Sequence, residues 1–277
     1  MKALFSSIAW APEQAVQVAS VLRKAGIKGI EAAPGLFDRP LSEVDVIQCK
    51  AVRTFWEQEQ LPIRAMQALL FGMPHLRLFG SSAEREELAN YLLHVIRVAG
   101  ALGAVPLVFG SPRNRARNGL AEDEAFSLAV DFFAKLAPHA AEGGCVLCIE
   151  ANTPAYHCDF ITTHAEAARL VAAVNSAGFG VHLDTGVMQM NGESPAQVLD
   201  VLNTYHLAPQ HIHISQPFLD VVHADTSFHV QLHTLLKVYG YAGAVSVEMK
   251  KPDHFSAIAT AAQTVAHTYG AYDVVSC

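Results

Sequence analysis

The fold of this protein is decided by the stretch Cys145-Val-Leu-Cys-Ile-Glu150-Ala-Asn152. A short apolar run leads into Glu150, with Gly143-Gly144 before it and Asn152-Thr-Pro154 after it. Such a run between turn residues is typical of a buried parallel strand. A carboxylate at its last position is poorly placed for packing. It points to the carboxyl end of the strand, where proteins built from βα units keep their chemistry.

Three further short apolar runs end in the same way. Gly180-Val-His-Leu-Asp184 ends in an aspartate, Gln210-His-Ile-His213 in a histidine, and Ala244-Val-Ser-Val-Glu248 in a glutamate. Consecutive end residues are separated by about one βα unit. If the strands are neighbours in a parallel sheet, their ends meet at one edge and bring these side chains together.

Strand-like and helix-like segments alternate along the whole chain. The predicted strands are 3–10, 29–34, 62–70, 104–110, 145–150, 178–184, 211–214 and 243–248. The predicted helices are 14–24, 45–60, 82–103, 122–142, 163–175, 195–203, 228–239 and 254–269, with a loop at 185–193. This alternation predicts a parallel sheet. Eight units in 277 residues fit a single (β/α)8 TIM barrel, one domain over 1–277.

An open, doubly wound sheet is the alternative architecture. It is disfavoured because the first strand is followed by SSIAWAPE, which lacks a glycine-rich phosphate turn.

Composition narrows the class of protein. The chain is 51% hydrophobic and 16% charged, with a net charge of −7, which disfavours a general nucleic-acid or membrane-surface binder. No apolar run has the length of a membrane span.

The five cysteines form no spaced framework, which indicates reduced thiols in a cytoplasmic protein. Cys145 and Cys148 point to opposite faces of a strand and are not expected to share a metal. The low charge is compatible with a homodimer.

The strand-end residues Glu150, Asp184, His213 and Glu248 predict a metal site. Three carboxylates at one edge repel one another and raise one another's pKa, and a divalent cation removes that penalty. An oxygen-rich donor set with one imidazole suits Mn²⁺ best, with Mg²⁺, Co²⁺ or Zn²⁺ as alternatives. The competing interpretation is that each residue is a separately satisfied polar group.

The runs VLCIEAN, FGVHLDTG, HIHIS and GYAGAVSVEMK resemble the xylose isomerase-like TIM-barrel superfamily. That superfamily contains sugar isomerases, ketose 3-epimerases, hydroxypyruvate isomerases, inosose dehydratases and endonuclease IV-type enzymes. The resemblance covers essentially the whole chain. In the ketose epimerase branch, the matching Glu, Asp, His and Glu positions hold one Mn²⁺ or Mg²⁺. The resemblance further implies that Glu150 and Glu248 exchange a proton with the sugar carbon from opposite faces.

Two positions depart from that pattern. Val187 stands where epimerases of this type commonly carry a histidine, and Gln216 follows His213 where an acidic residue is usual. Endonuclease IV-type enzymes need several further histidines, so a nuclease is disfavoured. We expect a metal-dependent isomerase or epimerase of a small sugar or related polyhydroxy carbonyl compound. A dehydratase (lyase) on the same barrel and a non-catalytic sugar-binding barrel are the alternatives.

Other polar and aromatic residues are candidates for contact with this small-molecule substrate. His182 faces the same side of its strand as Asp184, and His211 is expected to support His213 in the same way. The remaining candidates are Arg113 and Arg115 after the fourth strand, His157 after Glu150, Gln67 and Glu31 on early strands, and Trp10 as an apolar wall.

Overall fold

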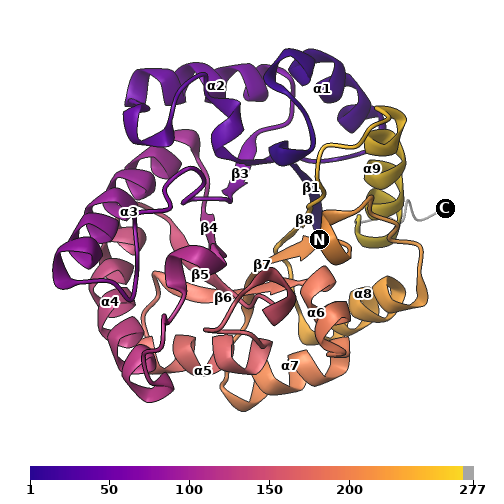
Figure 1. The fold of residues 1–277 in the computed structure, drawn as a ribbon. Coiled ribbons are helices and arrows are strands. Elements are labelled where there is room, and N and C mark those ends of the chain that lie inside the picture. Colours follow the sequence, from indigo (N-terminus) through magenta and orange to yellow (C-terminus); the bar gives the residue numbers. More distant parts are fainter. Residues whose placement is uncertain (271–277) are drawn as a thin grey trace.

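Eight parallel strands pair in chain order, and the last pairs with the first, so the sheet of the computed structural model closes into a barrel (Figure 1). The strands are β1 (Lys2–Ser6), β2 (Ile30–Ala32), β3 (Ile63–Met66), β4 (Pro106–Phe109), β5 (Val146–Glu150), β6 (Phe179–Asp184), β7 (Pro209–Ile214) and β8 (Ala244–Val247). The predicted TIM barrel is therefore confirmed. The structure describes residues 1–270, and Cys277 lies outside them.

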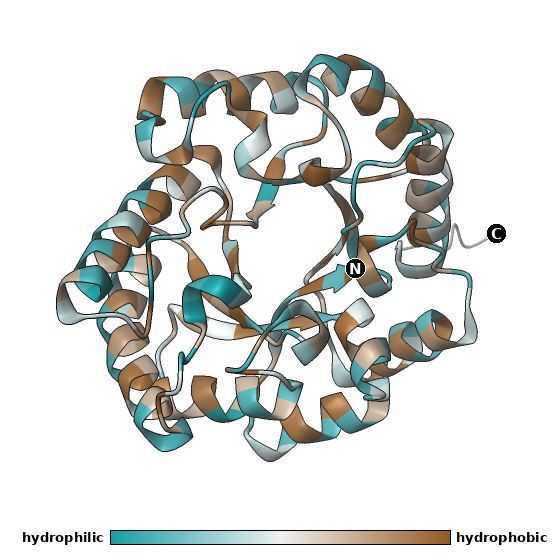
Figure 2. Cartoon of the chain, in the orientation of Figure 1, coloured by the Kyte–Doolittle hydropathy of each residue, from teal (hydrophilic) through white to brown (hydrophobic). Residues whose placement is uncertain are grey.

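Helices form a ring around the barrel (Figure 1). They are α1 (Ala15–Lys24), α2 (Val46–Gln58), α3 (Ser82–Leu102), α4 (Glu122–Glu142), α5 (His164–Val174), α6 (Thr185–Asn191), α7 (Pro195–Thr204), α8 (Ser227–Tyr239) and α9 (Ser256–Tyr269). Hydrophobic and hydrophilic residues alternate along this ring (Figure 2). None of the helices within residues 1–270 combines the length and apolar character that a membrane crossing requires.

Local sequence signals set the helix ends. Asp45 accepts the backbone N–H of Gln48 at the start of α2, and Ser81 accepts that of Glu84 at the start of α3. Each cap satisfies a backbone N–H that has no partner within its helix. Gly103 ends α3 in the left-handed region, with a φ of 84°, which glycine adopts without a steric penalty.

The third predicted strand ends at Met66 rather than at residue 70. Two other predicted elements were also wrong in part. Most of the predicted loop at 185–193 is helix α6, because the Asp184 carboxylate accepts the N–H of Val187 and caps the helix. The first strand ends at Ser6 rather than at residue 10, since the Ser6 hydroxyl accepts the N–H of Ile8 and the chain enters a 3-10 turn. Both differences arise from side-chain to backbone hydrogen bonds that compete with the predicted conformation.

The packing of α4 on the barrel depends on a glycine. A Cβ atom added to Gly178, just before β6, would lie 1.8 Å from the carbonyl oxygen of Ala137 on α4. The α4 backbone therefore approaches the start of β6 as closely as it does only because residue 178 has no side chain.

We predict that Gly178→Ala destabilises the barrel by about 1–3 kcal/mol, because a backbone carbonyl has to move. The matched control is Gly35→Ala, where an added Cβ meets nothing within 4 Å and φ is not positive. Thermal unfolding followed by circular dichroism should show a melting temperature for Gly178→Ala that is lower by roughly 2–4 °C per kcal/mol of destabilisation. Equal melting temperatures for the two variants would contradict the close contact.

Candidate active site

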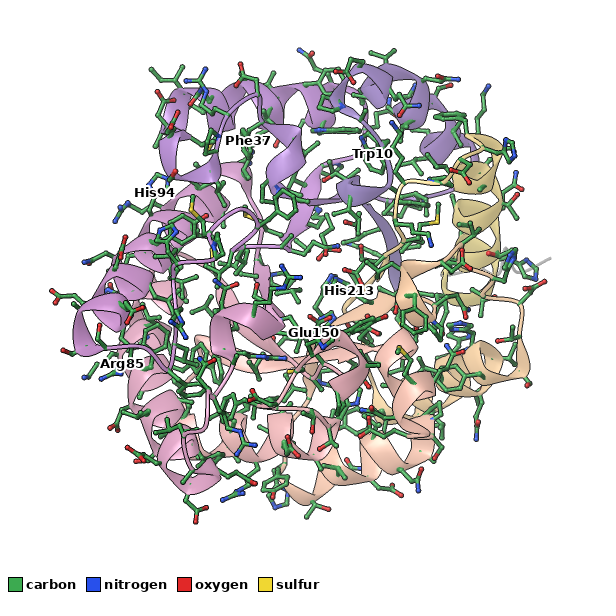
Figure 3. The ribbon with its side chains drawn as sticks, viewed as in Figure 1. Trp10, Phe37, Arg85, His94, Glu150 and His213 are labelled. Atoms are coloured by element: carbon green, nitrogen blue, oxygen red, sulfur yellow. The ribbon has the colours of Figure 1, made fainter. Side chains whose placement is uncertain are left out.

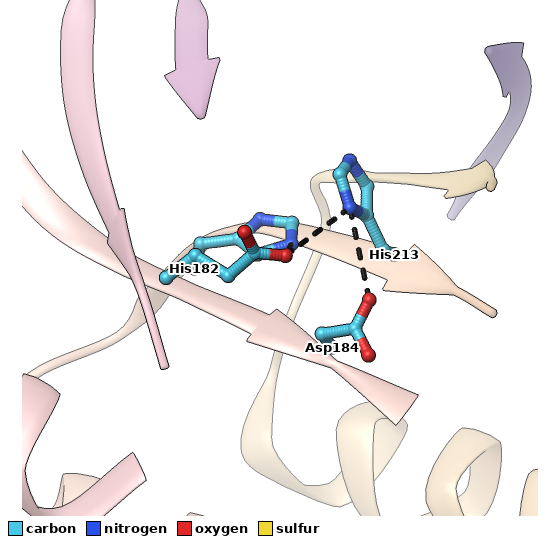
Figure 4. A group of neighbouring side chains, drawn as sticks. His182, Asp184 and His213 are labelled. Atoms are coloured by element: carbon cyan, nitrogen blue, oxygen red, sulfur yellow. Dashed lines mark ion pairs between the residues drawn. The ribbon is translucent and has the colours of Figure 1, made fainter. Parts of the chain in front are cut away.

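Side chains from four consecutive strands converge at the carboxyl-terminal end of the barrel. Nδ1 of His213 lies 3.2 Å from Oε2 of Glu248, 3.8 Å from Oε1 of Glu150 and 3.8 Å from Oδ2 of Asp184. His213 and Glu150 lie near the centre of the ring in Figure 3, and Figure 4 shows Asp184 and His182 beside His213. Three carboxylates thus face one imidazole nitrogen.

These carboxylates form the floor of an open cavity of about 750 Å³. Glu150, Asp184 and Glu248 line it, while His213 lies beneath them and is 1% exposed. The volume is within the usual range of small-molecule sites. A ligand entering from solvent therefore meets the carboxylates before the imidazole.

The orientation of His213 is set from below by Glu31 of β2. Nε2 of His213 lies 3.1 Å from both carboxylate oxygens of Glu31, and Nε2 of His211 lies 3.1 Å from one of them. A carboxylate only accepts hydrogen bonds, so Nε2 of His213 carries the proton that is donated to it. In the neutral ring, the lone pair of Nδ1 is then directed at the three carboxylates.

The residues present fit a divalent cation. Nδ1 of His213 is buried and has no hydrogen-bond partner among the described residues. It faces carboxylate oxygens, which are also acceptors, so a cation or an added proton has to lie between them. Glu150, His182, Asp184 and His213 each offer a donor atom within 4.8 Å of the others. Glu248 is outside this group, although its Oε2 is the oxygen nearest to Nδ1 among these contacts.

The pKa values of the buried groups are shifted because several charges lie close together. Burial, followed by the charges of Glu248 and Glu150, raises the pKa of Asp184 to about 8. Burial opposes the charged form of His213, but Glu248 and Glu31 outweigh it and raise the pKa of His213 well above the ordinary value. Burial also opposes ionisation of Glu31, yet His213 and His211 lower its pKa overall. Positive charge is therefore favoured at this point, whether proton or metal.

Hydrogen bonds hold the carboxylates in place, and several of their partners were not predicted. The Ser215 hydroxyl donates to Asp184 over 2.8 Å, and the backbone N–H of Val187 donates to it over 2.7 Å. The side-chain amide of Asn152 donates to Oε2 of Glu150 over 3.0 Å. Asn152 and Ser215 each lie two residues beyond a predicted metal ligand, and this spacing is the feature of the sequence from which both could have been predicted.

Gly110, after β4, also shapes the site and was not predicted. A Cβ atom at this position would lie 2.0 Å from Oε2 of Glu150, so a larger residue would displace the carboxylate. Because Gly110 has no side chain, the Glu150 carboxylate can occupy this volume.

Three of the other predicted residues lie at the cavity or directly beneath it. Gln67 lines the cavity and donates to Ser6 and Glu31. Arg113 lines the rim. His182 is fully buried, with Nε2 3.8 Å from Glu150, and neither ring nitrogen has a hydrogen-bond partner among the described residues. Burial, together with His213 and His211, lowers the pKa of His182, which favours a neutral ring.

The other predicted substrate contacts lie elsewhere: Glu31 is fully buried beneath His213, and three further residues lie outside the cavity. Arg115 is fully buried behind Glu150, where it donates to the Glu150 backbone carbonyl over 2.7 Å. Trp10 packs against Phe5 and Trp56 in the core, because the first strand ends before it. His157 is exposed and takes a left-handed conformation, with a φ of 59°, that ends a 3-10 turn. None of the three is among the described residues that line the cavity.

Comparison with known proteins defines the class. The family model of the xylose isomerase-like TIM barrel matches residues 19–269, so the chain belongs to this family. This confirms the resemblance found in the sequence. A search of curated proteins gives no match.

Solved structures share the fold at low identity. D-psicose 3-epimerase from Clostridium cellulolyticum H10 has a TM-score of 0.78 and 15% identity, over 97% of this chain and 98% of that chain. The 3-keto-D-glucoside 4-epimerase of E. coli has a TM-score of 0.73 and 18% identity, over 95% and 97%. The IOLI protein, solved with a zinc atom, has a TM-score of 0.74 and 18% identity, over 97% and 98%.

We predict that Glu31→Gln weakens Mn²⁺ binding by about 10- to 100-fold, because the acceptor that orients His213 and raises its basicity is lost. Isothermal titration of Mn²⁺ into metal-free protein measures the change. Glu57→Gln is the control, since Glu57 pairs with Arg53 on the outer helix α2 and is outside the cavity lining. Unchanged Mn²⁺ affinity in Glu31→Gln would show that the Glu31 contact does not prepare a metal ligand.

Proposed function

We propose that this protein is a divalent-metal-dependent isomerase or epimerase acting on a small sugar or related polyhydroxy carbonyl compound. The observation that carries the proposal is the convergence of three carboxylates on Nδ1 of His213 at the floor of an open cavity. Two of the structural relatives described above are sugar epimerases by name, and the third was solved with zinc. These relatives support the proposal by likeness of fold.

The proposed metal ligands are Glu150, Asp184, His213 and Glu248, with Mn²⁺ as the expected ion. When bound, the ion would polarise the substrate carbonyl and stabilise negative charge that develops on its oxygen. The neutral His182, beside Glu150, is in position to assist as a further ligand or as a hydrogen-bond partner of the substrate.

Glu150 and Glu248 are the proposed proton-transfer groups. Both line the cavity; Glu150 is the last residue of β5 and Glu248 directly follows β8, and these two strands are not adjacent. One carboxylate removes the proton from the carbon next to the carbonyl, and the other returns a proton from the opposite face. Return to the same carbon inverts it and gives an epimer. Return to the neighbouring carbon gives an aldose–ketose isomer.

The surroundings of Glu150 suit this role. The Asn152 amide holds one carboxylate oxygen, and the Arg115 guanidinium holds the backbone carbonyl of the same residue. Side chain and main chain of Glu150 are thus fixed independently. A base held in one orientation spends less free energy on reaching the geometry of the transition state.

Metal analysis tests the first part of the proposal. Protein purified without chelator or nickel affinity resin should contain about one equivalent of Mn, Mg, Co or Zn per chain by elemental analysis, since the donor set forms one site. Removal of the metal should lower the melting temperature, because a ligand that binds only the folded state stabilises it. Protein that contains no metal and takes none up would count against the site.

We predict that Glu150→Gln and Glu248→Gln each lower proton exchange by at least about 100-fold, because each removes one proton acceptor. Exchange of substrate protons with D₂O, followed by NMR on a panel of ketoses and hydroxy acids, measures the loss at saturating Mn²⁺. Glu142→Gln is the control, since Glu142 is an exposed residue at the end of α4. Full exchange in both variants would refute the proposed roles.

Product analysis separates the remaining alternatives. An epimerase or isomerase conserves the mass of its substrate, whereas a dehydratase gives a product lighter by one water. A conjugated product of that kind also absorbs in the ultraviolet. A non-catalytic sugar-binding barrel would bind the ligand without any exchange of its protons.

A further inference from the structure

The cavity above the carboxylate floor has an apolar mouth. We use this name for Leu70, Phe71, Met73, Phe218 and Leu219, which line the cavity from the loops after β3 and β7. Phe71 is 76% exposed and Phe218 is 63% exposed. Single exposed apolar residues are common on proteins, but two aromatic rings at the rim of one cavity form a patch of the kind that marks a binding site.

The backbone of the apolar mouth is held in an unfavourable conformation. Phe218 and Leu219 have φ values of 61° and 55°, and Ala68, which also lines the cavity, has a φ of 55°. Residues with a side chain avoid this left-handed region, and it persists where the surrounding structure enforces it, often at ligand sites. The loops therefore present these side chains at a cost in backbone energy.

A contact from a third loop fixes the Phe218 ring. The backbone N–H of Phe218 donates to the hydroxyl of Tyr156 over 2.7 Å. The two rings meet edge to face, with centroids 5.8 Å apart and planes at 86°. Tyr156 also lines the cavity. The exposed Phe218 ring is thus oriented before any ligand arrives, which reduces the entropy lost on binding.

The polar groups of the cavity are distributed unevenly. Its carboxylates lie on the floor, and Arg113 is the only cationic residue among the described residues that line it. Of the neutral polar side chains in the lining, Asn114, Asn152 and Ser215 already donate to protein groups. A free sugar carries hydroxyl groups on nearly every carbon. Hydroxyl groups placed against the apolar mouth would lose their water without gaining partners, which is unfavourable.

We propose that the substrate is a two-part molecule: a carbonyl sugar that meets the carboxylate floor, joined to an aromatic group that the apolar mouth holds. This inference rests on the proposed function and adds the substrate class to it. Burial of an aryl group removes apolar surface of the ligand and of Phe71 and Phe218 from water together. The sugar end supplies the hydroxyl and carbonyl oxygens that the floor can recognise.

A binding experiment with matched probes tests this inference. The probes are phenyl and methyl 3-keto-β-D-glucoside, and 6-O-benzyl- and 6-O-methyl-D-fructose, so that the aryl group is placed at either end of a sugar. Isothermal titration into the full-length, Mn²⁺-loaded protein should show at least one aryl probe binding about tenfold more tightly than its methyl partner. Equal affinity within both pairs would overturn the inference.

Variants locate the effect at the apolar mouth. Phe71→Ala and Phe218→Ala should each lower the ratio of aryl-probe to methyl-probe affinity by about three- to tenfold. Ile47→Ala is the control: Ile47 is 77% exposed on α2 and outside the cavity lining, so both affinities should be kept. Because both phenylalanine rings are largely exposed, we expect these variants to fold, and their melting temperatures verify it.

The remaining outcomes separate this inference from the proposed function. If methyl probes bind and exchange protons but aryl probes gain nothing, the function stands and the two-part substrate is refuted. If no probe binds and no sugar exchanges protons, the proposed function fails and the inference with it. If light scattering shows an oligomer that the Phe71→Ala/Phe218→Ala double variant converts to monomer, and no aryl preference exists, the mouth is a subunit contact instead.

Discussion

The candidate site depends on one ion pair inside the barrel, between Glu31 and His213. Glu31 belongs to β2 and His213 to β7, which are not neighbours in the sheet, so the contact crosses the interior. It is possible only when the barrel closes. By accepting the hydrogen bond from Nε2–H, Glu31 directs Nδ1 toward the carboxylates of Glu150, Asp184 and Glu248. The first quarter of the chain therefore orients a residue of the last quarter, and the site is a property of the whole barrel.

The concentration of charge on the floor has consequences for stability. Asp184 and His213 are almost fully buried. The raised pKa of Asp184 shows that burial and the neighbouring carboxylates disfavour its ionised form, whereas the raised pKa of His213 shows that Glu248 and Glu31 favour a positive charge. Ser215, Asn152 and the N–H of Val187 supply hydrogen bonds that offset part of this cost. A divalent cation would offset more. The side chains that lower the stability of the folded protein are thus the same side chains that are proposed to bind the metal.

The charged floor and the apolar mouth are proposed to bind different parts of the substrate. The floor is built from strand ends, which are rigid and set by the pairing of the sheet. The apolar mouth is built from the loops after β3 and β7, and loops of this kind can change without disturbing the barrel. Changes in the loops can therefore reshape the apolar mouth while the strand ends keep the floor.

The amino-acid sequence by itself determined the alternation of strands and helices and the Glu, Asp, His and Glu at four strand ends, because these depend on local periodicity and on spacing along the chain. Tertiary structure decided what no local pattern contains. The sequence pointed to Glu31 and His211 as candidates, but not to the fact that the Glu31 carboxylate contacts both His211 and His213. It also predicted Arg115 in the cavity, whereas Arg115 is buried behind Glu150. Helix α6 was missed because the backbone N–H of Val187 in its first turn donates to the carboxylate of Asp184, a residue predicted only as a metal ligand. The contacts of Glu31 and Arg115 join residues far apart in sequence and exist only once the barrel has closed, whereas the Asp184 cap is a local side-chain to backbone bond.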